Sequence, residues 1–265
     1  MGAGQLKVGE IAARIEKRIP LSWAEEWDNS GLSVGDPNRE VNKIAVALDV
    51  SCETVGHAAA AGCQLLVTHH PAIFRPLNTV LYDVPAEKAV AAAIKHGLAL
   101  YAAHTNWDVS PEGVNVCLAG ALNLEDIMPL QKPTVRNGAW GLGAIGKLKS
   151  SLSVKECLEL LIERWHLTDA RAYGDLARKI SKIALGGGAC GDLWPLAKKV
   201  GADVFITSDV RYSERNDALS MDLNVINTDH GETERVSLMA LESVVESVSG
   251  LEVETLEESG PRRIA

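Results

Sequence analysis

Six potential metal ligands lie in three short segments that are far apart in the sequence. Each segment follows an apolar run that predicts a β-strand. The candidate ligands are His69 and His70 in LLVTHHPAIF, His104 and Asp108 in YAAHTNWDV, and His230 and Glu234 in TDHGETE. Four imidazoles and two carboxylates are more donors than one catalytic ion usually takes, so the simplest arrangement that uses all of them is a pair of divalent ions.

The spacing within two of the segments suits different parts of a dinuclear site. Neighbouring side chains on extended backbone point to opposite sides, so His69 and His70 can serve two ions. Pro71 favours the extended conformation at His70. His230 and Glu234 are four residues apart at the start of a predicted helix and therefore share one face, from which Glu234 can bridge both ions.

The segment from His104 to Asp108 is predicted to be a loop, in which Asp108 reaches an ion and His104 either ligates or orients a neighbour. Each segment also has an interpretation without metal. One histidine of the 69–70 pair then lies in the core and the other on the surface, Asp108 is a turn residue, and the last pair is exposed at a helix start. The three segments together favour the metal site, because ligands of open α/β sheets gather beyond the carboxyl ends of strands.

Apolar runs alternate with helical stretches along most of the chain, which predicts an α/β fold. Strands are expected at 44–50, 64–68, 98–103, 141–148, 182–187, 203–207, 223–227 and 251–256. Helices are expected at 7–18, 51–60, 85–96, 111–121, 153–165, 190–200 and 233–248, with a further short helix ending at 220. Strands that are apolar throughout indicate mostly parallel sheets covered on both faces. A stretch rich in Pro, Gly and polar residues at 128–138 separates two predicted lobes, 1–128 and 129–265.

The composition is that of an ordinary globular protein: 265 residues, 46% hydrophobic and 23% charged. The net charge of −9 gives no sequence-independent attraction for nucleic acid or anionic membranes. No signal peptide and no membrane span are expected. The five cysteines form no CxxC pair and are expected to be buried thiols in a reducing compartment, which predicts a cytoplasmic location.

Three further segments could contribute to a site. Two of them allow two interpretations, and the third could support the metal ligands. The glycines at 186–188 either hold a phosphate with their N–H groups or, as we expect, let a helix and a sheet pack closely. The segment WDNSG at 27–31 either lines a pocket with an aromatic face and hydrogen-bonding groups or forms a turn. The segment TSD at 207–209 can orient metal ligands. The sequence contains no GxSxG elbow, so a nucleophilic serine is not expected.

The motifs WDNSGLSVGD, IAVALDV, LLVTHHPAIF, AAHTNWDV with GVN behind it, IALGGGAC, GADVFITSDVRY and HGETE follow one another in the chain. In this order they resemble the interacting-factor-three-like family, also labelled dinuclear metal centre proteins or GTP cyclohydrolase 1 type 2 homologues. The resemblance covers nearly the whole chain, and the short interval at 128–138 matches members that lack an inserted domain. It implies two Rossmann-like three-layer α/β lobes, a dimetal site in the cleft between them, and a ring-shaped homohexamer.

The resemblance also implies which residues hold the metals. The expected ligands are His69, His70, Asp108, His230 and Glu234, with His104 at or beside the metals. Two divalent ions per subunit are expected, of zinc, iron, manganese, cobalt or nickel. The chain departs from the family pattern at Asp229, where a glycine usually precedes the last histidine. It departs again at Ser213, where a histidine usually follows the Arg-Tyr pair, and this bears on any proton-transfer role there.

The expected function is that of a metal-dependent hydrolase, in which a metal-bridged hydroxide attacks a nucleotide-like substrate. By resemblance the reaction is the opening of the GTP imidazole ring with loss of formate. Phosphoester hydrolysis is an equally physical use of the same site, and no nucleotide-specific motif separates the two. The alternative is a non-enzymatic, metal-stabilised ring that binds a partner protein or handles metal ions.

Overall fold

The structure is a computed structural model that describes residues 5–133 and 138–256 of the chain. It divides into two compact units: unit 1 comprises the residues up to 107 together with those from 238 onward, and unit 2 comprises residues 108–237. The division therefore differs from the predicted lobes 1–128 and 129–265, because the C-terminal segment returns to unit 1. Part of the predicted boundary at 128–138 lies outside the described residues.

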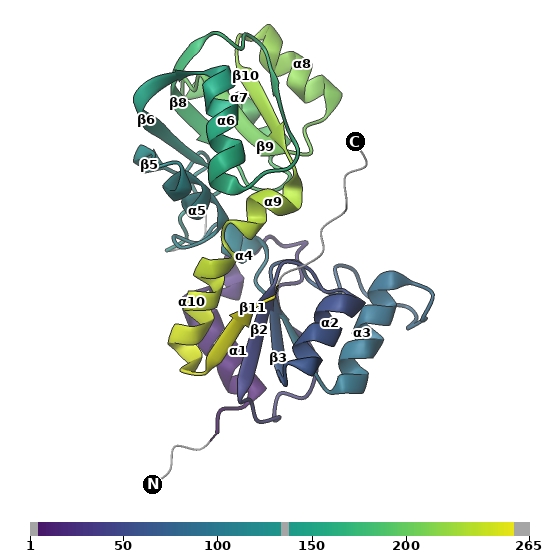
Figure 1. The fold of residues 1–265 in the computed structure, drawn as a ribbon. Coiled ribbons are helices and arrows are strands. Elements are labelled where there is room, and N and C mark those ends of the chain that lie inside the picture. Colours follow the sequence, from purple (N-terminus) through teal and green to yellow (C-terminus); the bar gives the residue numbers. More distant parts are fainter. Residues whose placement is uncertain (1–4, 134–137, 257–265) are drawn as a thin grey trace. The chain divides into compact units, whose positions relative to one another are not determined.

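Unit 1 is built on a five-stranded sheet with the strand order β1-β4-β3-β2-β11 (Figure 1). The strands are β1 (Gly31–Val34), β2 (Lys43–Ala47), β3 (Leu65–Thr68), β4 (Ala99–Ala102) and β11 (Glu252–Thr255). The pairings among β4, β3, β2 and β11 are parallel, and β1 joins the edge antiparallel to β4. β3 and β4 are buried along their whole length, as their unbroken apolar sequences predict.

Helices cover both faces of this sheet (Figure 1). On one face α1 (Val8–Arg18) packs against α10 (Leu238–Ser249), and the Arg14 guanidinium donates to the Val248 carbonyl at 3.0 Å. On the other face α2 (Cys52–Ala60) and α3 (Pro85–His96) pack against each other and complete an apolar core. Ser51 begins α2 as predicted, since its hydroxyl accepts from the Thr54 N–H at 3.0 Å.

Unit 2 is built on a six-stranded sheet with the order β5-β6-β8-β9-β10-β7 (Figure 1). The strands are β5 (Glu125–Met128), β6 (Ala144–Ser153), β7 (Ala170–Tyr173), β8 (Lys179–Leu185), β9 (Val204–Ser208) and β10 (Asn224–Thr228). Only β8, β9 and β10 pair in parallel within the described part of this sheet; its other three pairings are antiparallel. The prediction of a mostly parallel sheet is thus right for unit 1 and wrong for unit 2.

The helices of unit 2 also form two groups (Figure 1). They are α5 (Val114–Ala121), α6 (Val154–Trp165), α7 (Trp194–Lys199), α8 (Tyr212–Ser220) and α9 (His230–Arg235). α5 and α6 pack together against β6, whereas α7 and α8 pack together near β9 and β10. The predicted mixed α/β fold with two sheets is therefore confirmed.

Two short segments beside candidate ligands differ from their predicted conformations. The helix expected over 233–248 is interrupted at residues 236–237, where the buried Ser237 hydroxyl donates to the Glu234 carbonyl at 2.8 Å, and so forms α9 and α10 separately. The segment after His104 is the short helix α4 (Thr105–Asp108) instead of a loop. Both differences lie next to candidate ligands.

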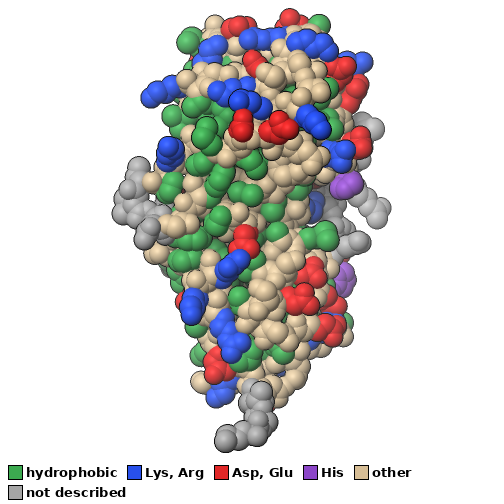
Figure 2. Space-filling model, turned by 90° about the vertical axis from the view of Figure 1, so that its left-hand side faces the viewer, with side chains coloured by type: hydrophobic (Ala, Val, Ile, Leu, Met, Phe, Trp, Pro, Cys, Tyr) green, Lys and Arg blue, Asp and Glu red, His purple; other side chains and the backbone are tan. Residues whose placement is uncertain are grey.

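The surface carries charges of both signs. On the face drawn in Figure 2, Lys and Arg side chains alternate with Asp and Glu side chains, so the described residues on this face form no continuous basic surface. Within the described residues, no helix has the length and apolar composition needed to cross a bilayer.

Candidate metal centre

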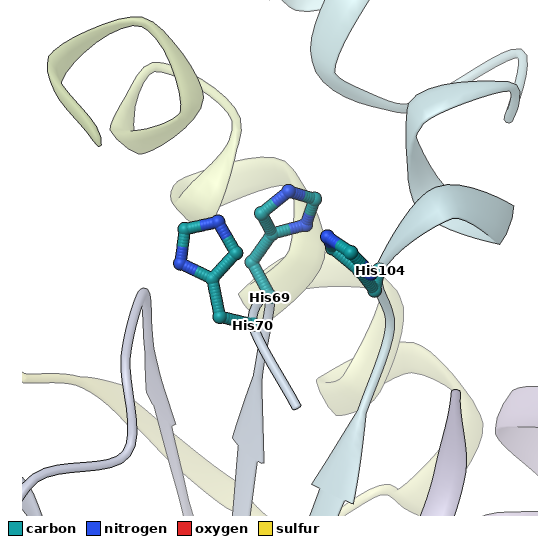
Figure 3. A group of neighbouring side chains, drawn as sticks. All are labelled: His69, His70 and His104. Carbon is teal, nitrogen blue, oxygen red and sulfur yellow. The ribbon is translucent and has the colours of Figure 1, made fainter. Parts of the chain in front are cut away.

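Three of the predicted ligands form a cluster in unit 1, which we call the histidine cluster: His69, His70 and His104. Each offers a ring nitrogen that lies within 4.8 Å of those of the other two. The ring centroids are 4.9 Å apart for His69 and His70, 5.2 Å for His69 and His104, and 5.6 Å for His70 and His104. Figure 3 shows the three imidazoles gathered above the ends of two neighbouring strands.

The two parallel strands β3 and β4 position these side chains. His69 and His70 follow the last residue of β3, and His104 lies two residues beyond β4, at the same edge of the sheet. The chain bends at His69 and His70 instead of remaining extended. Their rings therefore approach each other, and the prediction that the two side chains point to opposite sides is wrong.

The Nδ1 atoms of the two adjacent histidines each face an oxygen acceptor. His69 is buried, and its Nδ1 lies 2.9 Å from the Ala103 carbonyl, which requires a proton on Nδ1. The Nδ1 of His70 lies 2.7 Å from an oxygen of Asp49, which follows β2. In the neutral imidazole a proton on Nδ1 makes Nε2 the nitrogen with the lone pair, and this tautomer is the one that metal-ligating histidines commonly adopt.

His104 is held in the same way by Asp28. Its Nδ1 lies 2.8 Å from Asp28, whose side chain is fully buried and also accepts hydrogen bonds from Ser30 and from the backbone and hydroxyl of Thr105. Burial raises the pKa of the Asp28 carboxyl, but the hydrogen bonds from His104, Thr105 and Ser30 lower it further, so the pKa lies well below its usual value. Asp28 is therefore an ionised anchor for the His104 ring.

The other three predicted ligands gather in unit 2, and we call them the carboxylate cluster: Asp108, His230 and Glu234. His230 begins α9, and its Nε2 lies 3.0 Å from an oxygen of the buried Glu234, one helical turn further on. A carboxylate oxygen of Asp108 lies within 4.8 Å of one of Glu234. The Nδ1 of His230 lies 2.7 Å from Asp209, so this histidine has the same arrangement as those in unit 1.

These acidic neighbours change the protonation of His230. Its pKa is raised from 6.5 to about 9, mainly by the hydrogen bond to Glu234, with a further contribution from Asp209 and an opposing effect of burial. Without a cation beside it, His230 is therefore protonated at neutral pH. A metal ion bound at this position would replace that proton.

The glycines at 186–188 form the close-packed corner that the sequence predicts. A Cβ on Gly187 would overlap Val114 of α5, and a Cβ on Gly188, whose φ is +66°, would meet Glu234. Their N–H groups donate within unit 2: Gly187 donates to the Asn115 side chain at 3.0 Å and Gly188 to the Thr233 hydroxyl at 3.2 Å. This turn serves helix packing and the approach to Glu234, which disfavours the phosphate interpretation.

Asp49 was not among the predicted site residues, although a pattern in the sequence could have found it. Asp49 follows β2 and contacts His70 at the end of the next parallel strand, while Asp209 follows β9 and contacts His230 beyond β10. In both units the aspartate precedes its histidine by 21 residues. The same strand-helix-strand arrangement thus places one Asp–His pair in each unit. Asp209 contacts the candidate ligand His230, which is the supporting role predicted for the segment 207–209.

Asp229 and Ser213, the two departures from the expected family pattern, lie on different elements of unit 2. Asp229 caps α9, since its side chain accepts from the Glu232 N–H at 2.9 Å. Ser213 lies on α8 and is exposed. Neither substitution removes a member of the carboxylate cluster.

Comparison with known proteins identifies the class to which this fold and these clusters belong. The family model of Duf34/NIF3 (NGG1p interacting factor 3) matches residues 6–261. The chain belongs to this family, as the sequence motifs predict.

Relatives and solved structures are similar over most of the chain. A GTP cyclohydrolase 1 type 2 homolog from Clostridium perfringens is 34% identical over 86% of this chain and 87% of its own length. NIF3-like protein 1 from Drosophila melanogaster is 32% identical over 86% of this chain and 78% of its own length. The crystal structure of a Bacillus cereus protein related to NIF3 superposes with a TM-score of 0.93 at 23% identity, covering 99% of this chain and all (100%) of that one. Reduced HcgD from Methanocaldococcus jannaschii, at 28% identity, gives a TM-score of 0.77 over 96% of this chain and 99% of that one.

Proposed function

We propose that the protein is a metal-dependent hydrolase with a dinuclear centre and a nucleotide-like substrate. The histidine cluster and the carboxylate cluster are proposed to supply the ligands of the two ions jointly. Imidazole and carboxylate donors suit zinc, iron, manganese, cobalt or nickel.

One observation carries the proposal. All four histidines of the two clusters present Nδ1 to an oxygen acceptor: His69 to a carbonyl, and the other three to aspartates. A neutral imidazole has one donor and one acceptor nitrogen, and the repeated orientation of Nδ1 toward a carboxylate or carbonyl, which leaves the lone pair on Nε2, is the usual support of a metal ligand. The donor set therefore fits divalent cations.

The residues have distinct tasks in this proposal. The imidazoles of the histidine cluster bind metal, and Asp28 and Asp49 keep their tautomers and ring orientations. Glu234, with two oxygens on a buried side chain, is the candidate bridging ligand. When bound, two divalent ions make water acidic enough to act as a nucleophile near neutral pH and polarise the atom that is attacked.

The proposed substrate class follows from the relatives. Several are named GTP cyclohydrolase 1 type 2 homolog, and opening of the GTP imidazole ring is a hydrolysis that such a centre can carry out. Hydrolysis of a phosphoester uses the same chemistry at phosphorus. Formate release distinguishes the first reaction from the second, in which phosphate is released.

The experiment compares metal-loaded wild-type protein with His70→Ala, Glu234→Ala and the control His57→Ala. His57 is exposed on α2 and belongs to neither cluster. Metal content is measured by elemental analysis, and formate and phosphate release from GTP and a nucleotide panel are measured under saturating substrate. We expect two ions per chain and turnover for wild type and His57→Ala, and loss of both for the cluster variants. Equal inertness of all four proteins would refute the enzymatic function.

A non-enzymatic assembly is the second candidate, and an exposed apolar segment favours it. Val80, Leu81 and Tyr82, in the connection between β3 and α3, are about half exposed or more, as expected for a surface that contacts a protein. In this case the cluster variants lose metal and thermal stability, yet no protein in the series shows turnover. The homohexameric ring that the family resemblance implies remains a prediction, tested by native mass spectrometry with and without chelator.

A further inference from the structure

Two exposed aromatic side chains stand beside the histidine cluster in unit 1. Trp27 is 60% exposed and Phe74 is 44% exposed, and their ring centroids are 5.7 Å apart. Both centroids lie 6.2 Å from that of His104. Burial of a large aromatic side chain is normally favourable, so two such rings left in water next to a candidate reaction centre point to a contact made by a ligand.

The backbone around these rings is fixed on both sides. The Glu25 N–H donates to the Thr105 hydroxyl at 2.9 Å, and Asp28 accepts from the same hydroxyl, so both flanks of Trp27 are tied to α4. The Asn29 side chain donates to the Ile73 carbonyl at 2.5 Å, which links this segment to the residue before Phe74. The backbone that carries the two aromatic residues is therefore tied down before any ligand binds, and this lowers the entropic cost of binding.

The rings of Trp27, Phe74 and His104 do not stack face to face on one another. The planes of Trp27 and Phe74 are inclined by 56°, so the two rings are not stacked on each other. His104 meets Trp27 at 75° and Phe74 at 79°, and therefore covers neither ring face to face. A planar ring stacked on the indole would lie next to His104.

We propose that Trp27 and Phe74 form a stacking wall for a planar, aromatic heterocycle, and that this wall selects the substrate by its ring. The inference rests on the proposed function, because it concerns the substrate of the same centre. A purine has the required flat π-face, whereas a substrate composed only of sugar and phosphate does not. Stacking of a base on an aromatic side chain tolerates many ring types, so the wall selects a chemical class.

The test measures binding, with no requirement for turnover. Metal-loaded protein is titrated with GTP and, in parallel, with inorganic tripolyphosphate by calorimetry. We expect Trp27→Ala to weaken GTP binding by roughly 5- to 150-fold, the factor associated with loss of one base-aromatic contact, and to leave tripolyphosphate binding within about twofold. Trp27→Phe keeps a ring and retains most of the affinity for GTP.

Tyr82→Ala is the matched control, because Tyr82 is a more exposed aromatic residue of unit 1 outside the wall. Circular dichroism and thermal melting show that each variant is folded. The inference is overturned if Trp27→Ala binds GTP as wild type does, if it weakens both probes equally, or if Tyr82→Ala has the same effect. GTP binding that depends on Trp27 without any turnover refutes the proposed hydrolase but supports the wall. Turnover that depends on His70 but not on Trp27 supports the proposed hydrolase and refutes the wall.

Discussion

The substitution Asp28→Asn tests most directly whether the histidine orientations reflect a metal centre. The Asp28 side chain has no exposed surface. One oxygen accepts from the Asn29 N–H at 2.7 Å and from His104 Nδ1 at 2.8 Å, while the other accepts from Ser30 and twice from Thr105 at 2.6–3.1 Å. An asparagine amide must turn its NH₂ group toward one of these sets of donors, whichever way it is oriented.

The magnitude follows from this count of displaced donors. A hydrogen bond to a charged group contributes about 1.5–3 kcal/mol, and at least two are lost, although the buried charge is removed at the same time. We therefore expect the free energy of unfolding of the metal-free protein to fall by about 2–4 kcal/mol. Loss of an outer carboxylate that orients a ligating histidine weakens metal binding by about 10- to 100-fold.

The assay combines urea unfolding of the metal-free protein with metal binding measured by competition against a chromophoric chelator. Asp49→Asn is the matched control, since Asp49 orients His70 but its side chain is 52% exposed. Solvent screening limits its effect on unfolding to about 1 kcal/mol or less. If both variants lose the same stability, or if Asp28→Asn binds metal as tightly as wild type, the role assigned to the buried carboxylate is wrong.

Three further predictions concern protonation, backbone conformation and metal. In the metal-free protein the pKa of His230 is about 9, against 6.5 unperturbed. The stabilisation that protonated His230 contributes to the folded state is therefore complete below about pH 6.5 and is lost as the pH rises through 9. NMR titration should show that Glu234→Gln returns the pKa of His230 toward 6.5. Gly188→Ala should destabilise more than Gly62→Ala, because both glycines have positive φ but only Gly188 would place its Cβ against Glu234. The shared backbone strain costs about 1–2 kcal/mol, and urea unfolding of the two variants isolates the steric part; equal losses would argue against the close approach. Metal added to 100 times its Kd should raise the free energy of unfolding by about 2.7 kcal/mol, and a thermal melt that chelator leaves unchanged would contradict a metal that is bound to the folded state.

The buried strands could be predicted because their sequences have a single physical interpretation. Runs such as LLVT and VFITS, apolar and rich in β-branched residues, become β3 and β9, both of them fully buried. β1, at the sheet edge, begins at a glycine with a φ of +108° and is not among the predicted strands, because four residues, two of them buried and two half-buried, give little hydrophobic signal. The break between α9 and α10 carries neither Gly nor Pro, and helical periodicity continues across it, so the sequence contains no signal for it.

The candidate ligands could be predicted from local sequence, but their supports mostly could not. Each ligand segment follows a strand and carries imidazole or carboxylate groups, which is a signal that short windows contain. The contact between Asp28 and His104 joins residues 76 positions apart, and Asp28 lies in a segment that has a plausible interpretation as a turn. Asp49 is a partial exception, because it precedes His70 by the same 21 residues by which Asp209 precedes His230, but only the parallel pairing of β2 with β3 shows that Asp49 and His70 meet.

The sequence of unit 2 is inserted within that of unit 1, and this determines the order in which the two units can fold during synthesis. The ribosome finishes unit 2 once residue 237 has been made, whereas unit 1 still lacks α10 and β11. Until those last elements emerge, the edge of β2 is bare and the apolar side of α1 is uncovered, which exposes the nascent chain to association. The histidine cluster thus belongs to the half of the molecule that is completed last.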